Sequence, residues 1–306
     1  MIKIYTFNWS FFYDLTRCIK EVFDNNKIEY QVFIREVEEL SPKKRNDNDL
    51  WILSFDCFYD IAVHFKKNIK EYLPKKFIYY HCEAIDKDLS DKRFFDCNYI
   101  TEILPLAQQV WCYSQLYTQW FNSRGIPTIY APLYYSSCLE LPLKYKNREK
   151  TIDILLYGLI NERRRNCILK LKNMGFNVFV PQLASPEMLL DGEAMNDYVS
   201  RSKIVLSVYY NEKDNLRPFD FSRLSPLICK KAVIVTEKSH DIEINKIFEE
   251  RINMAEYTDI ATVCQKILDN YGHYKYLAEQ TFQWFKEYYK FEKCIDIGFV
   301  KNLALE

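Results

Sequence analysis

The sequence predicts an α/β protein of two halves, each built on a parallel β-sheet whose faces are covered by helices. Short apolar runs alternate with amphipathic segments from the first residues onward, the pattern of buried parallel strands joined by helices. A strand, a glycine, a helix and a second strand follow one another at residues 152–180, roughly midway along the chain. The length of 306 residues fits two domains of ~100–200 residues each.

The first half contains six candidate strands, at residues 2–7, 30–34, 50–55, 77–80, 109–113 and 128–131. Apolar residues at helical spacing predict helices at 14–23, 61–72, 100–107 and 116–124. Pro74 stops the second of these helices, and Gly125 and Pro127 end the fourth. Residues 136–150 are polar and lack a strong period, so we expect a linker there.

The second half repeats the alternation of strands and helices. After the unit at 152–180 we expect a helix at 195–201, a strand at 203–209, a helix at 223–229, a strand at 232–236 and helices at 258–271 and 273–289. The predicted domains are therefore residues 1–140 and 150–284. A C-terminal helix, about residues 285–306, is expected to pack back on the first domain.

Composition excludes several classes of protein. The 42 basic and 42 acidic residues balance, so no global charge draws the chain to nucleic acid or to an anionic membrane. The ten cysteines are scattered without a C-x-x-C pair, as expected for buried thiols in a reducing compartment. Asn8 and Asp14 interrupt any apolar run that a secretory signal needs, and no stretch approaches the ~20 apolar residues of a membrane span. We expect a cytoplasmic protein.

The strand–glycine–helix unit at 152–180 is the strongest functional signal. Gly158 ends the strand, and a helix N-terminus directs free N–H groups and a positive dipole end into the same turn, which favours an anion. The helix opens with Asn161 and the arginines at 163–165. Three consecutive helical residues spread around ~300°, so one or two arginines, and not all three, reach a diphosphate. The alternative is a solvated basic first turn.

A second group of polar residues lies between a buried strand and a helix, where ligands of parallel α/β sheets bind. It comprises Tyr209, Arg217, Asp220, Ser222 and Arg223. The alternative interpretation is an ordinary loop with a hydrophilic tip.

Candidate acid–base groups lie in the first half. His81 and Glu83 follow the fourth strand, and Asp14 and Asp56 follow the first and third. A buried, satisfied polar pair is an equally good explanation of His81 and Glu83. The triplet at 47–49, D-N-D, precedes a strand rather than following one, and the four histidines lack ligand spacing, so we expect no metal site.

Several segments resemble the GT-B glycosyltransferases of the CgeB-like and group 1 families. Those proteins carry a strand, a glycine and an N-x-R-R helix start, matched here by Y-G-L-I-N-E-R-R at 157–164. Residues 197–210 and 219–239 are similar to the family's S-K-I-V-L-N strand and to its acidic-x-x-R helix with the following strand. Residues 77–83, F-I-Y-Y-H-C-E, and 110–114, V-W-C-Y-S, resemble paired segments of its N-terminal domain.

The resemblance implies two Rossmann-like domains facing a central cleft, with a nucleotide-sugar donor on the C-terminal domain. The donor diphosphate would lie near the residues Gly158, Asn161, Arg163, Arg164, Arg217 and Arg223. The sugar would lie against the loop before Asp220, which fits the first of two family acids. Pro226 occupies the place of the second, which grips the donor ribose, so Glu237 or a backbone group is expected to substitute.

The implied activity is a metal-independent hexosyl- or pentosyltransferase without a cofactor. It would move a sugar to a hydroxyl of a glycan, glycolipid or glycoprotein, with Glu83, His81 or Asp14 as base. One alternative is a DNA glycosyltransferase acting on a modified base, and the clusters at 43–45 and 75–76 are basic enough to contact phosphates. Another is a degenerate GT-B binding or scaffold subunit, which Pro226 motivates.

Overall fold

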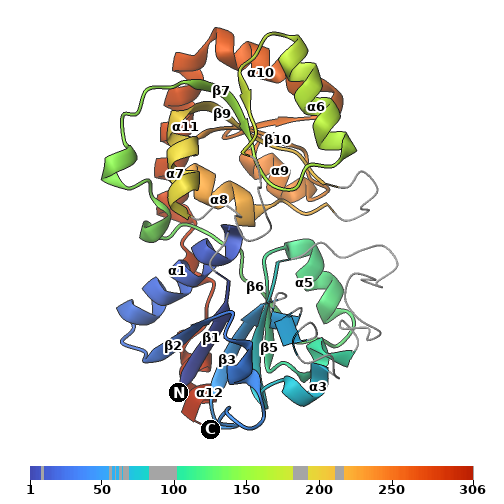
Figure 1. Ribbon diagram of the computed structural model, residues 1–306, viewed down its shortest axis with the longest axis vertical. Helices are drawn as coiled ribbons and strands as arrows, with labels where there is room; N and C mark the ends of the chain where they lie inside the picture. The colour runs from blue at the N-terminus through green and yellow to red at the C-terminus, as the bar shows by residue number, and fades with distance from the viewer. Residues whose placement is uncertain are drawn as a thin grey trace. The chain divides into compact units, whose positions relative to one another are not determined.

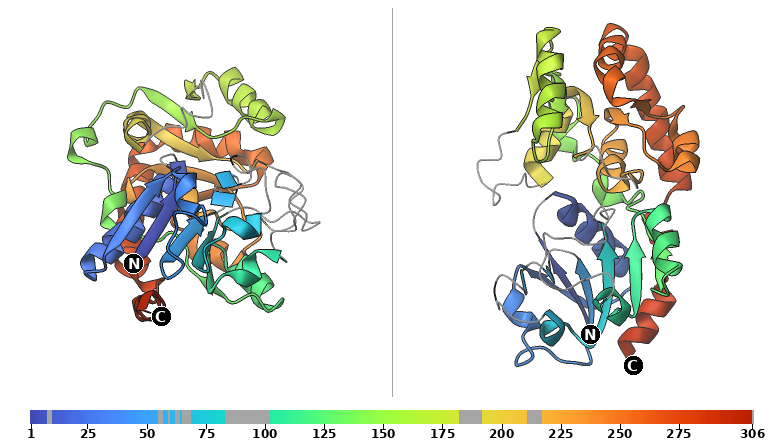
Figure 2. Two further views of the ribbon diagram at one scale, coloured as in Figure 1. Left: turned by 60° about the horizontal axis from the view of Figure 1, so that its bottom comes forward. Right: turned by 90° about the vertical axis from the view of Figure 1, so that its right-hand side faces the viewer.

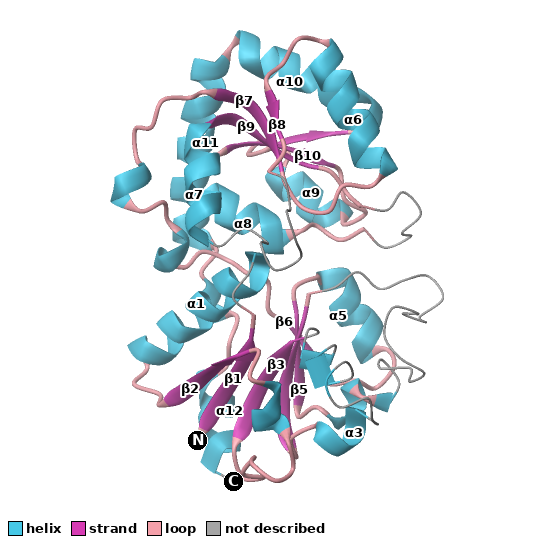
Figure 3. Ribbon diagram, viewed as in Figure 1, coloured by secondary structure: helices cyan, strands magenta, loops and turns pink. Residues whose placement is uncertain are grey.

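The computed structural model describes residues 1–7, 10–54, 57–58, 60–61, 64, 69–82, 102–181, 192–210 and 217–305 (Figure 1). The chain divides into two compact units. Unit 1 comprises residues 1–8, 15–133 and 291–306, and unit 2 comprises residues 9–14 and 134–290. Each unit contains one parallel sheet (Figure 3).

Unit 1 is built on six parallel strands in the order β2-β1-β3-β4-β5-β6. The strands are β1 (Ile2–Thr6), β2 (Tyr30–Ile34), β3 (Leu50–Ser54), β4 (Lys76–His81), β5 (Gln109–Cys112) and β6 (Thr128–Tyr130). Its described helices are α1 (Ser10–Asn25), whose first five residues belong to unit 2, α3 (Ile69–Tyr72), α5 (Gln115–Asn122) and α12 (Ile297–Leu305). Both chain termini lie in this unit (Figure 2).

Large aromatic residues fill the core of unit 1. Trp51, Tyr79, Tyr80 and Trp111 are fully buried on three neighbouring strands. The Tyr80 hydroxyl donates to the carbonyl of Ala131 at 2.7 Å, which satisfies a polar group that would otherwise be costly to bury. Part of the chain's aromatic content, 16% of its residues, therefore fills this core.

Unit 2 is built on five parallel strands in the order β11-β10-β9-β7-β8. They are β7 (Ile152–Leu156), β8 (Val178–Phe179), β9 (Ser202–Ser207), β10 (Val233–Glu237) and β11 (Asn253–Ala255). Its helices are α6 (Glu162–Asn173), α7 (Gly192–Arg201), α8 (Phe221–Cys229), α9 (Ile242–Phe248), α10 (Ile260–Asp269) and α11 (Tyr271–Tyr288). Buried aliphatic residues of β7, β9, β10, α6 and α10 form one continuous core.

The predicted α/β class with two parallel sheets is confirmed, and most strands lie within two residues of their predicted limits. Of the helix predicted at 100–107, residues 100 and 101 lie outside the described residues, and Leu104–Leu106 form a 3₁₀ turn that contains Pro105. α9 and β11 were not predicted from the sequence, because each is short and only partly apolar. α12 lies within the C-terminal helical segment expected at about 285–306. Among the described residues, no helix is both long and apolar enough to cross a membrane.

Candidate functional site

The candidate site lies where three neighbouring strands of unit 2 end. β7 is followed by Tyr157 and Gly158, β9 is followed by residues 208–210, and β10 ends at Glu237. Because the strands are parallel, their carboxyl ends meet at one edge of the sheet, where ligands of α/β folds bind. The N-termini of α6 and α8 follow two of these strand ends in the chain.

Gly158 is required at this turn for two reasons. Its φ of +101° lies in a region that residues with a Cβ rarely adopt. A Cβ placed there would also lie 3.2 Å from Arg164 Nη1 and 3.2 Å from Arg223 Nη2. Two guanidinium groups therefore converge on a backbone turn that has no side chain of its own.

Arg164 is a buried cation. Its Nε and Nη2 donate to the carbonyl of Val208 at 2.9 and 2.6 Å, and its Nη1 donates to the carbonyl of Leu159 at 2.7 Å. Burial, followed by the positive charge of Arg223, lowers the pKa of Arg164 to about 9. The site thus holds two cations whose repulsion an anion would relieve.

The start of α6 also fixes the segment that follows β9. Asn161 caps the helix, since its Oδ1 accepts from the Arg164 backbone N–H at 3.0 Å. Its Nδ2 donates to the carbonyl of Tyr210 at 2.5 Å, and Arg163 Nη1 donates to the carbonyl of Tyr209 at 3.1 Å. Arg164 binds the carbonyl of Val208 as described above. The carbonyls of residues 208, 209 and 210 therefore each accept a hydrogen bond from a side chain at the start of α6. We call residues 208–210 the clamped segment.

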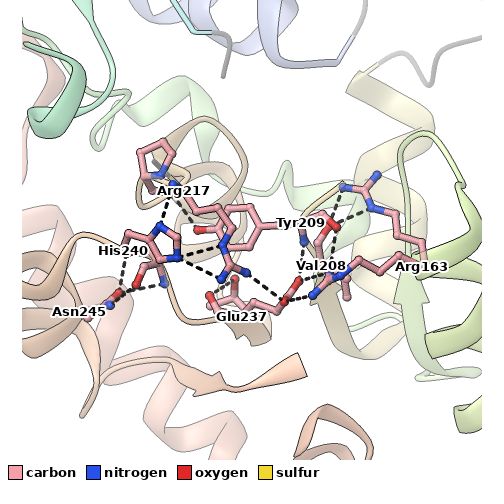
Figure 4. Close-up of polar contacts among 11 residues, drawn as sticks. Arg163, Val208, Tyr209, Arg217, Glu237, His240 and Asn245 are labelled. Atoms are coloured by element: carbon pink, nitrogen blue, oxygen red, sulfur yellow. Dashed lines mark hydrogen bonds and ion pairs between the residues drawn. The ribbon is translucent and has the colours of Figure 1, made fainter. Parts of the chain in front are cut away.

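Glu237 is the second anchor of the clamped segment (Figure 4). Arg163 binds it in a bidentate ion pair, with Nη1 at 2.7 Å from Oε2 and Nη2 at 2.5 Å from Oε1. The backbone N–H of Tyr209 donates to Oε2 at 2.7 Å, and Arg217 Nη1 lies 3.6 Å from Oε1. Glu237 is only 3% exposed, so this carboxylate organises the loop, and its role as a ribose ligand stays a prediction.

Arg217 and His240 contact each other beside Glu237. Arg217 Nη2 lies 3.1 Å from His240 Nε2, and the His240 backbone N–H donates to the Arg217 carbonyl at 2.7 Å. The guanidinium carbon of Arg217 lies 5.4 Å from the ring centroid of Tyr209, whose hydroxyl donates to the Pro218 carbonyl at 2.7 Å. Arg217 therefore belongs to the Glu237 cluster.

Asp220 caps α8 by accepting from the Arg223 backbone N–H at 3.3 Å, and the Ser222 hydroxyl also donates to it. Arg223 Nε lies 3.9 Å from the Asp220 carboxylate, and its Nη1 donates weakly to the Tyr157 carbonyl at 3.4 Å. Arg223 is thus the less tightly bonded of the two arginines over Gly158. Pro226 is buried inside α8.

The acid–base candidates of the first half occupy different environments. His81 is fully buried on β4, and its ring centroid lies 4.9 Å from that of Phe121 and 5.7 Å from that of Tyr117. This environment is that of a core residue, so we do not propose His81 as the catalytic base. Asp14 lies on the part of α1 that belongs to unit 2. Burial is the main cause that raises the pKa of Tyr157 to about 12, and the charge of Asp14 adds a smaller contribution. Glu83 and Asp56 lie outside the described residues.

The acidic triplet at 47–49 and the basic clusters near it neutralise one another. Asp47 pairs with Lys75 at 2.7 Å and with Arg45 at 3.2 Å, and Asp49 pairs with Lys3 at 3.0 Å. These residues precede β3 and β4, so they lie at the amino ends of the strands. Within the described part of the chain, no group of three His, Cys, Asp or Glu side chains is arranged to hold a metal ion.

Sequence reasoning missed two members of the site. Tyr257 stacks on Arg163, with the guanidinium carbon 3.9 Å from its ring centroid, and its hydroxyl donates to the Arg163 carbonyl at 2.7 Å. His240 is the other. Tyr257 follows β11 and His240 follows β10, and a position just after a strand end was the available signal.

No protein-family model matches the sequence, and no curated protein matches it either. Solved structures do match the fold. T4 phage BGT in complex with UDP and Mn²⁺ aligns over 99% of both chains with a TM-score of 0.61 and 11% identity. The fold is therefore GT-B.

Two further matches support that assignment of the fold. A sucrose-phosphate synthase from Thermosynechococcus elongatus aligns over 99% of this chain and 96% of its own, with a TM-score of 0.58 and 11% identity. An alpha-glucosyltransferase in complex with UDP and a 13-mer DNA containing a HMU base aligns over 100% and 99%, with a TM-score of 0.55 and 11% identity.

Proposed function

We propose that this protein is a glycosyltransferase that binds a nucleotide-sugar donor and transfers the sugar to an acceptor hydroxyl. The observation that carries the proposal is the pair of guanidinium groups, Arg164 and Arg223, that converge within 3.2 Å of the Cβ position of Gly158. A diphosphate over this turn would accept hydrogen bonds from backbone N–H groups of the helix start. Its negative charge would also relieve the repulsion between the two cations. The GT-B fold of the comparison structures supports the same conclusion.

The chemistry follows from where the charge develops. As the bond from the anomeric carbon to the phosphate oxygen breaks, the leaving diphosphate gains negative charge, which fixed cations and amides stabilise. Arg164 is held in place by three hydrogen bonds to carbonyls, so little reorganisation is needed during the reaction. We propose that these arginines replace a metal ion. Turnover that survives EDTA and does not rise with Mn²⁺ supports this, and turnover that requires added Mn²⁺ contradicts it.

The acceptor hydroxyl must lose a proton. Asp14 and Glu83 are the proposed bases. Asp14 lies near enough to Tyr157, the residue before Gly158, for its charge to add to the rise in the pKa of that tyrosine that burial mainly causes. A hydroxyl of a glycan, glycolipid or glycoprotein is the proposed acceptor, and a relationship to the CgeB-like group 1 enzymes is part of the proposal. We also propose that the protein acts in the cytoplasm, since its ten cysteines are scattered without a C-x-x-C pair.

The direct test is a panel of nucleotide sugars and nucleoside diphosphates. Binding to the folded state raises the melting temperature, so we expect at least one nucleoside diphosphate to stabilise the protein. The same donor should then be consumed when a competent acceptor is added. Binding without turnover on any acceptor would favour the degenerate binding subunit, and no binding at all would remove the glycosyltransferase proposal.

DNA is the second candidate acceptor, because one aligned structure of nearly equal length is a complex with UDP and a DNA 13-mer. Duplex binding should weaken steeply with salt, because released counterions drive such contacts. Lys75 and Arg45 are already paired with Asp47, so they add little to that binding. Absence of duplex binding at low salt would exclude DNA as the acceptor.

A further inference from the structure

Two apolar side chains are exposed at the edge of the Gly158 turn. Leu159 follows the glycine and is 63% exposed, and Tyr210 ends the clamped segment and is 45% exposed. Both have fixed backbones, because the Leu159 carbonyl accepts from Arg164 at 2.7 Å and the Tyr210 carbonyl accepts from Asn161 at 2.5 Å. An aromatic ring held on such a backbone loses little conformational entropy when a ligand packs on it.

Arg164 connects this apolar pair to the anion site. Its Nη1 lies 3.2 Å from the Cβ position of Gly158, and its guanidinium carbon lies 5.5 Å from the ring centroid of Tyr210. The ring and the turn therefore border the same side chain. A ligand whose phosphates bind over Gly158 has the Tyr210 ring within reach of the group attached to those phosphates.

The other border of the turn is polar. Arg223 also converges on Gly158, and beside it lie the Asp220 carboxylate, 3.9 Å from Arg223 Nε, and the Ser222 hydroxyl that donates to Asp220. The anion site thus lies between an apolar pair and a polar group. A nucleotide sugar has the same order of parts: a flat aromatic base, a diphosphate and a hydroxyl-rich sugar.

We propose that Tyr210 stacks on the nucleobase of the donor, with Leu159 packing beside it, so that Tyr210 is the residue that distinguishes a nucleoside diphosphate from bare pyrophosphate. This inference rests on the proposed function and deepens it. Every base has a π-face, so stacking on Tyr210 supplies affinity for nucleoside diphosphates in general and does not select one base.

The test measures the dissociation constants of UDP, GDP, ADP and inorganic pyrophosphate by calorimetry, for the wild type and four variants. The variants are Tyr210→Ala, Tyr210→Phe, Leu159→Ala and the control Tyr276→Ala, which removes a 65% exposed tyrosine from α11. We expect Tyr210→Ala to weaken binding of the preferred nucleoside diphosphate by about 5- to 150-fold, the range for loss of one stacked base. Pyrophosphate binding should stay unchanged, as should both affinities in Tyr210→Phe and Tyr276→Ala.

Each other result overturns the inference in a recognisable way. Equal weakening of pyrophosphate and nucleoside diphosphate in Tyr210→Ala would mean that the residue acts only through the shape of the turn. Wild-type-like binding by Tyr210→Ala would overturn the stacking role and leave the proposed function intact, whereas a wild type that binds none of the four ligands would overturn both.

Discussion

Replacing Glu237 by Gln should destabilise unit 2 strongly. Glu237 and Arg163 are 3% and 10% exposed, and two short bonds join them, so the substitution leaves a buried guanidinium without its counter-charge. Breaking a buried pair from one side costs about 3–5 kcal/mol. The hydrogen bond from the Tyr209 N–H to Glu237 is weakened as well, so the loss should be concentrated in β9, β10 and the clamped segment.

Amide hydrogen exchange is the suitable assay, because it reports the free energy of local opening for each strand. Glu279→Gln is the matched control: Glu279 pairs with Lys231 at 2.7 Å, but both side chains are about 40% exposed, so its loss should cost about 0–1 kcal/mol. The double variant Arg163→Met/Glu237→Gln should lose less than the sum of the two single variants, because no uncompensated charge remains. Equal protection of the β10 peptides in Glu237→Gln and Glu279→Gln would refute the reasoning.

Four further outcomes are expected. Arg223→Ala should weaken binding of a nucleoside diphosphate by roughly 1.5–3 kcal/mol through loss of a charge-assisted contact, as measured by calorimetry. Arg163→Ala should lower the melting temperature as well as affinity, since Arg163 acts through Glu237 and the Tyr209 carbonyl. Gly158→Ala should abolish most diphosphate binding, because the turn has φ +101° and a Cβ would lie 3.2 Å from both guanidinium groups. Burial, followed by the charge of a neighbouring lysine, lowers the pKa of Lys150 from 10.5 to about 8, so stability should rise between about pH 8 and 10.5, where only the unfolded state keeps that proton.

Each of the following results would contradict one of these predictions. Unchanged affinity in Arg223→Ala would mean that the anion binds elsewhere. Tight diphosphate binding by Gly158→Ala would show that the turn is not the binding surface. For Lys150, the variant Lys150→Met should flatten the dependence of the melting temperature on pH in that window, and an unchanged slope would show that another group is responsible.

The candidate site was partly visible in the sequence. The glycine after an apolar strand and the N-x-R-R start of α6 indicated an anion site, and Gly158, Arg164 and Arg223 do converge. The sequence also indicated that the three arginines cannot share one ligand. It did not indicate that Arg163 turns away to Glu237, because its partner is separated from it by two strands of the chain.

The environment of His81, in contrast, could not be predicted from the sequence. A histidine at the carboxyl end of a strand fits both a catalytic group and a core residue, and local sequence does not distinguish them. The rings of Tyr117 and Phe121, more than thirty residues away in the chain, decide its environment.

The sequence by itself determined the α/β class, the order of most strands and helices and the position of the Gly158 turn. These depend on hydrophobic period, glycine and helix start signals, which act over a few residues. Only the tertiary structure decided which polar groups meet, because the order of the strands brings residues 158, 208–210 and 237 to one edge of a parallel sheet. Buried charges must then find partners among whatever groups the topology places beside them, and for Arg163 that partner is Glu237.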